Sequence, residues 1–535
     1  MSWEEIAKAS QAKVLQSIPD RFRLNVHDYK LVKDVTGVPY TCGLLTEAQL
    51  KITDFTATEI VKKLRSRQLK AVQVLEAFAG RAAIAHQLTN CLTEWFYEEG
   101  LEQAKKLDED LDRENQVKGV LHGVPMGLKD IHAIKGHATT MAFIAGRDNI
   151  AQDDSAIVAA LRAEGAVFFC KTTMPQSAMA IETVSNLWGR TSNPLDRDLN
   201  AGGSSGGDAV LVAMKGSPLS PSTDIGGSIR VPAAFNGLYA FKPTAARVPK
   251  GGMSDLGQSL IQVSFGPICH SIEDMELLTR VINAHPFNRY DVTCAPVPWK
   301  SLKAPKGKLR IGLMKWDGVV MPHPPVLRAL EHTRYVLEKS GHVVVEFEPP
   351  FDCWQALLTA FEVYFQGGAG KILAALDETG EPLIPAIVDL IRVFNIRQLP
   401  ALSGKVRAYK DQFLTAWNKT SGNGRPIDAL ICPPAPGIGY PHNFNTYWGY
   451  TALFNLLDYP SAIIPIRNLG ISPHQDPVDM QYTPLKTNPY DTANQDIYDP
   501  QLVSNQPLTI QIVGRPFEDE DLIQVASTVD ALLAA

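Results

Sequence analysis

Two serines in glycine-rich segments and one lysine in an apolar segment are the residues of this chain whose surroundings could support chemistry. Ser204 lies in the glycine-rich run 202–207, Ser228 follows a glycine pair further along, and Lys129 ends an apolar stretch. A serine hydroxyl can act as a nucleophile, and a lysine can act as a base when its amine is neutral. These residue types suit nucleophilic and acid–base chemistry.

The run 202–207, Gly-Gly-Ser-Ser-Gly-Gly, could by itself be a flexible linker. Its context favours another interpretation, because the residues that follow, 208–215, can form a helix. That helix would open at Asp208, an acidic residue suited to the positive end of the helix dipole. A glycine-rich turn that leads into a helix forms a cradle of backbone, which hydroxyl groups can approach closely.

The second glycine segment, 223–237, places Ser228 at the predicted start of a short helix that Gly237 can stop. Successive backbone N–H groups from Ile225 to Ser228 could turn inward and form a nest, the arrangement that a developing oxyanion needs. The alternative is a glycine turn in which Ser228 only caps the helix.

Lys129 lies in the sequence Gly-Val-Pro-Met-Gly-Leu-Lys-Asp, residues 123–130. A lysine is normally solvated at the surface, and this is the alternative interpretation for Lys129. In an apolar setting, however, desolvation lowers the lysine pKa. The neutral amine then becomes a competent base near pH 7.

The elements that must position these residues alternate between short apolar strands and helices from about residue 115 onward. A helix at 155–165 with a glycine stop leads into a buried strand at 166–170, and another helix is predicted at 324–340. Further strands are predicted at 308–314, 343–347, 427–432, 461–466 and 508–513. This alternation predicts an α/β fold with a sheet covered by helices on both faces.

The remaining segments set the predicted domain organisation. Residues 1–75, which include a capping-box start at 56–59, are predicted to form an N-terminal helical region packed on a catalytic domain that spans 76–535. Two stretches, 420–445 and 468–505, are poor in regular pattern apart from the strand predicted in the first. They are predicted to be lids or surface loops.

The composition is that of an ordinary soluble globular protein of 535 residues, with 45% hydrophobic and 20% charged residues. A formal net charge of −6 gives no sign of the basic face that nucleic-acid binding requires. The chain starts with acidic residues instead of a secretory signal, and no apolar run reaches the roughly 18 residues that span a bilayer. We therefore expect a cytoplasmic protein whose seven cysteines are reduced and mostly lie in the core.

Taken together, these segments resemble the amidase signature family. The run 202–244 resembles the signature itself, the spacing of Ser204 and Ser228 matches its two serines, and residues 127–130 match the family's lysine motif. The resemblance extends over nearly the whole chain, through segments 171–176, 191–194, 266–267 and 511–516. Within the family, the chain is most similar to fungal acetamidase-type general amidases, on segments 17–20, 81–85, 322–325 and 456–458.

The resemblance implies a central mixed sheet covered by helices and a Ser-Ser-Lys triad that needs no cofactor or metal. Ser228 would attack the amide carbonyl and pass its proton to Ser204, which would pass its own to neutral Lys129. Ser204 would follow a cis peptide bond from Gly203. The oxyanion hole would consist of Ile225, Gly226, Gly227 and Ser228. The residues that hold the two loops in register would be Ser205, Asp224 and Arg230.

The sequence therefore predicts an amidase that hydrolyses a carboxylic amide to an acid plus ammonia or an amine through an acyl-enzyme intermediate. No cluster of arginine or lysine marks a charged acyl group, so the expected substrate is a small neutral aliphatic or aryl amide. An apolar pocket could be lined by residues that could equally pack in the core: Met141, Met174, Trp188, Tyr447 and Trp448.

Two positions depart from the family pattern. Ser222 stands where many members have glycine, and Ala201 precedes the glycine pair where other small residues are common. Neither is a position of the triad. These departures bear on the detail of the loops and leave the expected chemistry unchanged.

Other functions are less well supported. The Gly-x-Ser-x-Gly string around Ser204 formally fits a Ser-His-Asp hydrolase, but residues 195–200 are too polar for the buried strand that precedes such a nucleophile. His132 and His137 lack the spacing of a metal site, and we expect surface or core histidines. The glutamine-hydrolysing subunit of a tRNA amidotransferase would need partner chains, and the acetamidase-like N-terminus argues against it.

A catalytically silent binding protein on the same fold is the alternative from a different functional class. The joint presence of Lys129, Ser204 and Ser228 argues against it. The expected partner is a small-molecule amide, and neither nucleic acid nor a membrane is expected. The oligomeric state is left open, with a homodimer as the one assembly considered.

Overall fold

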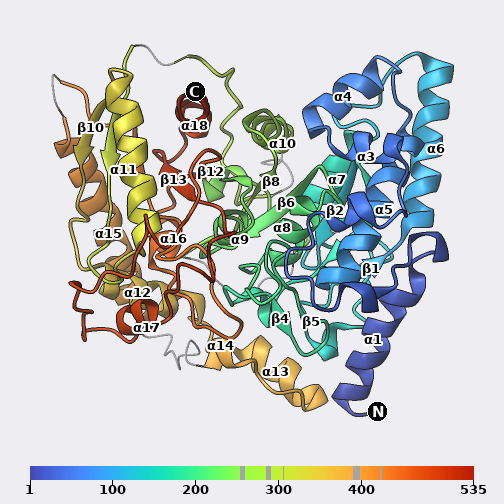
Figure 1. Ribbon diagram of the computed structural model, residues 1–535, viewed down its shortest axis with the longest axis horizontal. Helices are drawn as coiled ribbons and strands as arrows, with labels where there is room; N and C mark the ends of the chain where they lie inside the picture. The colour runs from blue at the N-terminus through green and yellow to red at the C-terminus, as the bar shows by residue number, and fades with distance from the viewer. Residues whose placement is uncertain (254–259, 285–290, 305–306, 389–397, 422–423) are drawn as a thin grey trace.

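A large mixed sheet runs through the middle of the molecule (Figure 1). The computed structural model describes residues 1–253, 260–284, 291–304, 307–388, 398–421 and 424–535. In spatial order the strands are β10 (Val343–Glu346), β9 (Arg310–Leu313), β11 (Ala429–Cys432), β13 (Thr509–Val513), β12 (Ser461–Pro465), β7 (Tyr239–Lys242), β8 (Ser264–Cys269) and β6 (Leu219–Asp224). β10, β9 and β11 pair in parallel, and the other pairs are antiparallel.

The strands predicted in the second half of the chain are confirmed as β9 to β13. β11, β12 and β13 are buried along their whole length, including the polar Gln511 of β13. β10 lies at the edge of the sheet and is only partly buried. The helix predicted at 324–340 is confirmed as α11 (Pro324–Lys339).

Helices cover both faces of this sheet (Figure 1). α10 (Ile272–Ala284) and α18 (Asp519–Ala534) lie on one side, and α9 (Arg230–Phe235) and α16 (Gly449–Leu456) lie on the other. The predicted α/β architecture is therefore confirmed. The remaining helices of the second half are α12 (Cys353–Tyr364), α13 (Gly370–Thr379), α14 (Pro385–Val388), α15 (Leu399–Lys419) and α17 (Tyr490–Asp496).

The first part of the chain forms a smaller three-stranded sheet with its own helices. The strand order is β1 (Leu92–Trp95), β3 (Val167–Thr172) and β2 (Pro125–Lys129), with β2 and β3 parallel. The predicted helix–glycine–strand unit is confirmed as α7 (Ala156–Ala163) followed by β3. The two sheets approach each other where the Ser220 hydroxyl of β6 donates a hydrogen bond to the Gly127 carbonyl of β2 (2.8 Å).

The helices of this part include the predicted capping box, in which the Thr56 side chain accepts from the Glu59 N–H. Most buried apolar residues form one large cluster that extends from Ala7 to Leu533. The predicted boundary at residue 75 falls inside a helix, and the division into two units stays a prediction. The helices are α1 (Trp3–Ser17), α2 (Val38–Thr41), α3 (Glu47–Thr53), α4 (Ala57–Arg65), α5 (Ala71–Thr89), α6 (Tyr97–Glu114) and α8 (Gly206–Ala213). A two-stranded ribbon consists of β4 (Val184–Ser185) and β5 (Gly189–Arg190).

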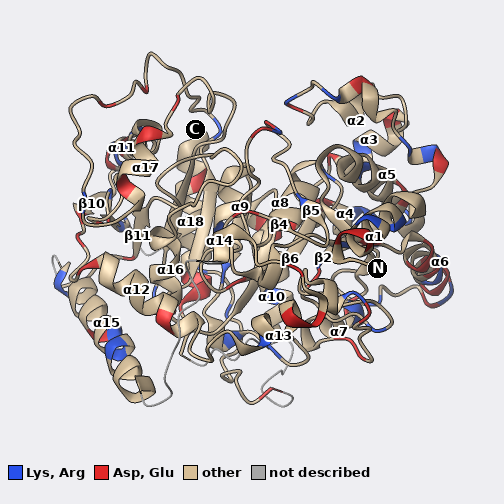
Figure 2. Cartoon of the chain, turned by 90° about the horizontal axis from the view of Figure 1, so that it is seen from below, with Lys and Arg blue, Asp and Glu red and all other residues tan. Residues whose placement is uncertain are grey.

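Acidic and basic residues are interspersed on outer helices such as α6 and α15, as Figure 2 shows.

All seven cysteines have free thiols and six are buried, which confirms the prediction of reduced, mostly core cysteines. Among the described helices, none combines the length and apolar content needed to cross a bilayer. The stretch 468–505, predicted to be irregular, contains α17. Cytoplasmic location and the oligomeric state stay predictions.

Candidate active site

Three separate elements bring Lys129, Ser204 and Ser228 to the junction of the two sheets. Lys129 is the last residue of β2, where it pairs with Thr172 of β3. Ser204 lies in the glycine-rich turn before α8, and Ser228 lies in the turn between β6 and α9. All three are buried, with at most 5% of their surface exposed. This burial excludes two alternative interpretations of the sequence: a solvated surface position for Lys129 and a flexible linker at residues 202–207.

The Lys129 amine is surrounded by hydroxyl groups. Its Nζ lies 2.7 Å from Ser204 Oγ, 2.9 Å from Ser205 Oγ and 2.9 Å from Thr223 Oγ1. Complete burial lowers its pKa from 10.5 to about 8. Near pH 8 a substantial fraction of the amine is neutral and can accept a proton.

The glycine-rich turn before α8 is packed so tightly that side chains would not fit. A Cβ on Gly203 would lie 2.6 Å from the Ala180 carbonyl oxygen, and a Cβ on Gly207 would lie 2.5 Å from the Thr173 nitrogen. The peptide bond between Gly203 and Ser204 is cis, as the family resemblance implies. The glycines are therefore required by close contact with neighbouring backbone.

Ser228 is tied to this turn through its backbone, because the Ser205 N–H donates to the Ser228 carbonyl (3.1 Å). Within the described residues, no hydrogen bond joins the Oγ atoms of Ser204 and Ser228. The helix α9 begins at Arg230, two residues later than the sequence predicts. The Asp224 carboxylate caps it, accepting from the Ile229 and Arg230 amides at 3.0 and 3.4 Å.

The backbone between Asp224 and Ser228 is fixed by side chains from α12 and α16. The Tyr364 hydroxyl donates to the Ile225 carbonyl (2.7 Å), and the Thr451 hydroxyl donates to the Gly226 carbonyl (2.8 Å). The Gly227 N–H, one of the four amides predicted for the oxyanion hole, donates to Asp224 Oδ1 (2.9 Å). The N–H groups of Gly226 and Ser228 have no acceptor among the described residues, so they are available to a ligand oxygen.

Asp224 and Arg230 form a fully buried bidentate ion pair, with Arg230 Nε and Nη2 at 3.0 and 2.9 Å from the two carboxylate oxygens. Burial opposes ionisation of Asp224, but the Arg230 guanidinium outweighs it and holds the Asp224 pKa well below its ordinary value. Asn455 and Gln511 complete the network around the pair. Asp224 and Arg230, two of the three residues predicted to hold the loops in register, thus form an ion pair beside the Ser228 loop.

Asp208 is a site residue to which the sequence assigned only a helix-dipole role. It does lie in the first turn of α8, but it is fully buried and accepts hydrogen bonds from hydroxyls. The donors are Thr172 (2.5 Å), Ser222 (2.7 Å) and Ser220 (3.3 Å). The sequence did contain one signal for such an acceptor. Ser220 and Ser222 occupy alternate positions of β6, so their side chains lie on the same face of the strand. Thr223, which contacts Lys129, was also missed.

The two histidines considered as a metal site are buried core residues. His132 Nε2 lies 3.1 Å from the Pro221 carbonyl, and burial lowers its pKa to about 3. His137 lies between Glu94 and Glu99. Within the residues that the structure describes, no group of three or more metal-type side chains is close enough to hold an ion.

Contacts of the described residues locate three of the five predicted pocket residues. Trp448 packs beside the oxyanion backbone, because a Cβ on Gly226 would lie 3.2 Å from its ring. Tyr447 donates instead to the buried Asp317 (2.7 Å). Trp188 lines a different cavity of about 420 Å³ between α1 and the 138–150 loop. Met141 is buried directly after Thr140, the hydrogen-bond partner of Trp188, and Met174 is buried as well.

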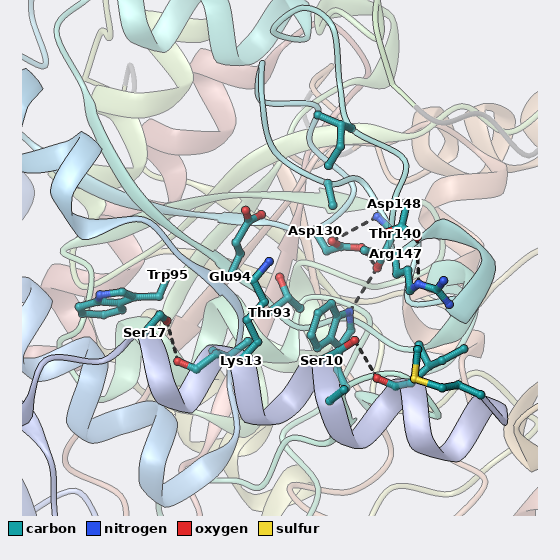
Figure 3. Close-up of a pocket in the computed structure, with 17 residues that line it drawn as sticks. Ser10, Lys13, Ser17, Thr93, Glu94, Trp95, Asp130, Thr140, Arg147 and Asp148 are labelled. Atoms are coloured by element: carbon teal, nitrogen blue, oxygen red, sulfur yellow. Dashed lines mark hydrogen bonds and ion pairs between the residues drawn. The ribbon is translucent and has the colours of Figure 1, made fainter.

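Figure 3 shows this cavity, with Ser10, Lys13 and Ser17 of α1 along one side and Asp130 and Thr140 on the other. The Trp188 indole N–H donates to Thr140 Oγ1 (3.2 Å), and that hydroxyl donates to Asp130 (2.8 Å). Trp188 therefore supports the residue next to Lys129.

Comparisons with known proteins agree along the whole chain. The Amidase family model matches residues 73–523. An amidase of Gibberella zeae is 59% identical over 100% of both chains, and an acetamidase of Emericella nidulans is 36% identical over 99% of this chain and 98% of its own. A solved fatty acid amide hydrolase has a TM-score of 0.92 at 28% identity, covering 99% of this chain and 95% of that chain.

Proposed function

This chain belongs to the amidase family and is an amidohydrolase that acts on amides, and from this premise we propose that it works through an acyl-enzyme on Ser228. Lys129 would be the base and Ser204 the proton relay. The observation that carries the proposal is the 2.7 Å contact between the buried Lys129 amine and Ser204 Oγ. A buried lysine with a lowered pKa beside a serine hydroxyl is the arrangement that such a relay needs.

In the proposed reaction, Ser228 Oγ attacks the amide carbonyl carbon while its proton passes to Ser204 Oγ. The Ser204 proton passes to the neutral Lys129 amine. When the tetrahedral intermediate collapses, the C–N bond breaks, and the leaving nitrogen takes a proton back along the same path. A water molecule then attacks the ester on Ser228 and passes a proton to the same relay. The ester C–O bond breaks, Ser228 Oγ takes that proton, and the acid is released.

The negative oxygen of the intermediate would be held by backbone N–H groups next to Ser228. The free amides of Gly226 and Ser228 support this role, since Tyr364 and Thr451 fix the orientation of the peptide units on the same segment. Gly227 would contribute by anchoring the loop to Asp224. Ile225 stays a predicted member of the oxyanion hole.

We propose small neutral aliphatic or aryl amides as the substrates. The apolar Trp448 ring beside Gly226 supports a neutral acyl group, and relatives named acetamidase, 36% and 37% identical over almost the whole chain, support a small one. A panel that runs from acetamide through arylalkyl amides to long-chain acyl amides, compared by kcat/KM, tests this. A preference of more than tenfold for long-chain amides would overturn the proposed substrate class.

The acyl-enzyme itself can be tested by covalent labelling. A fluorophosphonate probe should label the protein once, and peptide mass spectrometry should find the adduct on Ser228. A Lys129→Ala variant should label much more slowly, because the base is missing. An adduct on Ser204 or Ser205 in place of Ser228 would overturn the assignment of the nucleophile.

A further inference from the structure

We propose that Asp208 is a positioning residue for the catalytic lysine, whose carboxylate stabilises the positive charge that Lys129 acquires when it takes up the serine proton. The inference rests on the proposed role of Lys129 as the base. It concerns a residue outside the triad, the oxyanion hole and the Asp224–Arg230 pair.

The position of Asp208 next to the lysine follows from its hydrogen-bond donors. Thr172, which donates to Asp208 Oδ1, is the residue that pairs with Lys129 across β2 and β3. Ser222, which donates to Oδ2, directly precedes Thr223, whose Oγ1 lies 2.9 Å from Lys129 Nζ. The two strands that flank the lysine therefore also hold the carboxylate.

Three carboxylates surround Lys129, and they differ in how their charge is compensated. Asp208, Asp224 and Asp130 all raise the Lys129 pKa against the effect of burial, and Asp208 does so most. Asp224 is neutralised by Arg230, and Asp130 has Lys171 at 3.9 Å. Among the described residues, no cation lies within ion-pair distance of Asp208. Of the three carboxylates, Asp208 is therefore the one whose negative charge is not compensated by another cation and can stabilise protonated Lys129.

The hydrogen bonds of Asp208 suit this role. Burial raises the Asp208 pKa to about 6, and Lys129 and the three hydroxyls act against that rise. Asp208 is therefore ionised throughout the pH range around 8 in which Lys129 titrates. Hydroxyls satisfy the carboxylate without cancelling its charge, whereas a cation at that place would cancel it.

The carboxylate has a defined effect on catalysis. A lysine buried without a counter-charge would be neutral at lower pH, but it would also be a weaker base, because nothing would stabilise its protonated form. Asp208 raises the Lys129 pKa against the effect of burial and lowers the energy of the charge that forms during attack. Removing it should therefore shift the pH dependence in one direction and lower the maximal rate.

The test is the pH profile of kcat/KM for Asp208→Asn, with the substrate chosen from the amide panel. The acid limb, expected near pH 8 in the parent enzyme, should move down by about one pH unit, and the plateau at high pH should fall about tenfold. Asp208→Glu, which keeps the charge, should move the limb back toward the parent position. A lowered plateau with an unmoved limb would overturn the proposal, since a purely structural role has that result.

Two further variants keep the outcome decisive. Asp208→Ser removes the same charge with less bulk, so it should move the limb as Asp208→Asn does and replaces it if the asparagine variant does not fold. Asp274→Asn is the matched control, because Asp274 is also fully buried but accepts from the backbone of Ala57 and Thr58 at the start of α4. It should lower thermal stability and leave the limb in place.

Failure of this inference can be told apart from failure of the proposed function. If Lys129→Ala keeps the acid limb, the limb does not report on Lys129, and the proposed base is wrong whatever Asp208 does. If Lys129→Ala abolishes the limb but both neutral Asp208 variants leave it unmoved, only the inference about Asp208 fails.

Discussion

Two fully buried aspartates flank Lys129, the proposed base, and their surroundings are opposite. Asp224 is paired with the Arg230 guanidinium and has a pKa far below its ordinary value, whereas Asp208 is held by hydroxyls and has a pKa raised to about 6. Asp224 is the last residue of β6, and Asp208 accepts a hydrogen bond from Ser220 of the same strand. The side chains nearby, and not the degree of burial, decide the difference.

The contrast separates a part of the site that fixes geometry from the part in which we propose that protons are transferred. On the Asp224 side, charges cancel and the carboxylate fixes the start of α9 and the Gly227 amide. On the Asp208 side, hydroxyls hold a carboxylate that has no cation within ion-pair distance among the described residues. Ser228 lies where the two parts meet, because its loop follows Asp224 and its carbonyl accepts from the Ser205 N–H.

The largest effect is expected at that meeting point. Ser228→Ala removes the atom that becomes acylated, so turnover should fall by roughly 10³- to 10⁶-fold and fluorophosphonate labelling should be lost. The exposed Ser421→Ala is the control and should behave like the parent enzyme. Labelling that persists in Ser228→Ala would place the nucleophile elsewhere and remove the basis of the comparison.

Next in size is the loss of the base on the proton-handling side. In the parent enzyme, activity should rise as the pH increases through about 8, because deprotonation of Lys129 produces the neutral amine that accepts the proton. Lys129→Ala should lower kcat/KM by roughly 10²- to 10⁴-fold and flatten this rise. The exposed Lys339→Ala serves as the control. A mutant that keeps the pH dependence would require another base.

On the side that fixes geometry, the main loss should be in stability. Asp224→Asn leaves the buried Arg230 without its counter-charge, which should lower the free energy of unfolding by about 3–5 kcal/mol. Chemical denaturation at pH 8 measures this, and the acid limb of the residual activity should stay near the parent position. A large shift of the limb with little loss of stability would reverse the roles of the two aspartates.

The smallest effect is expected from Ser222→Ala, at a position where the chain departs from its family. The variant removes one hydrogen bond to a buried charged group, which should cost about 1.5–3 kcal/mol of unfolding free energy. It should also raise the Asp208 pKa further, because the lost hydroxyl favours the ionised carboxylate. Equal stability of mutant and parent would show that Asp208 does not depend on this donor.

The sequence by itself determined the α/β class, the five strands β9 to β13, the capping box at Thr56 and the three residues that meet at the candidate site. These features depend on local pattern: apolar runs bounded by turn residues, a capping motif, and glycines where backbone must pass closely. The sequence also singled out Asp224 and Arg230 as residues that hold the loops in register, and the structure added their ion pair.

Only the tertiary structure decided which predicted pocket residues lie near Ser228, and what surrounds Asp208. Trp188 and Trp448 have similar sequence environments, but one lies beside α1 and the other beside Gly226. The donors to Asp208 come from two strands that meet only when the two sheets pack together. A pKa depends on every charge and dipole within a few ångströms, and that neighbourhood is fixed by long-range packing that the local sequence pattern does not contain.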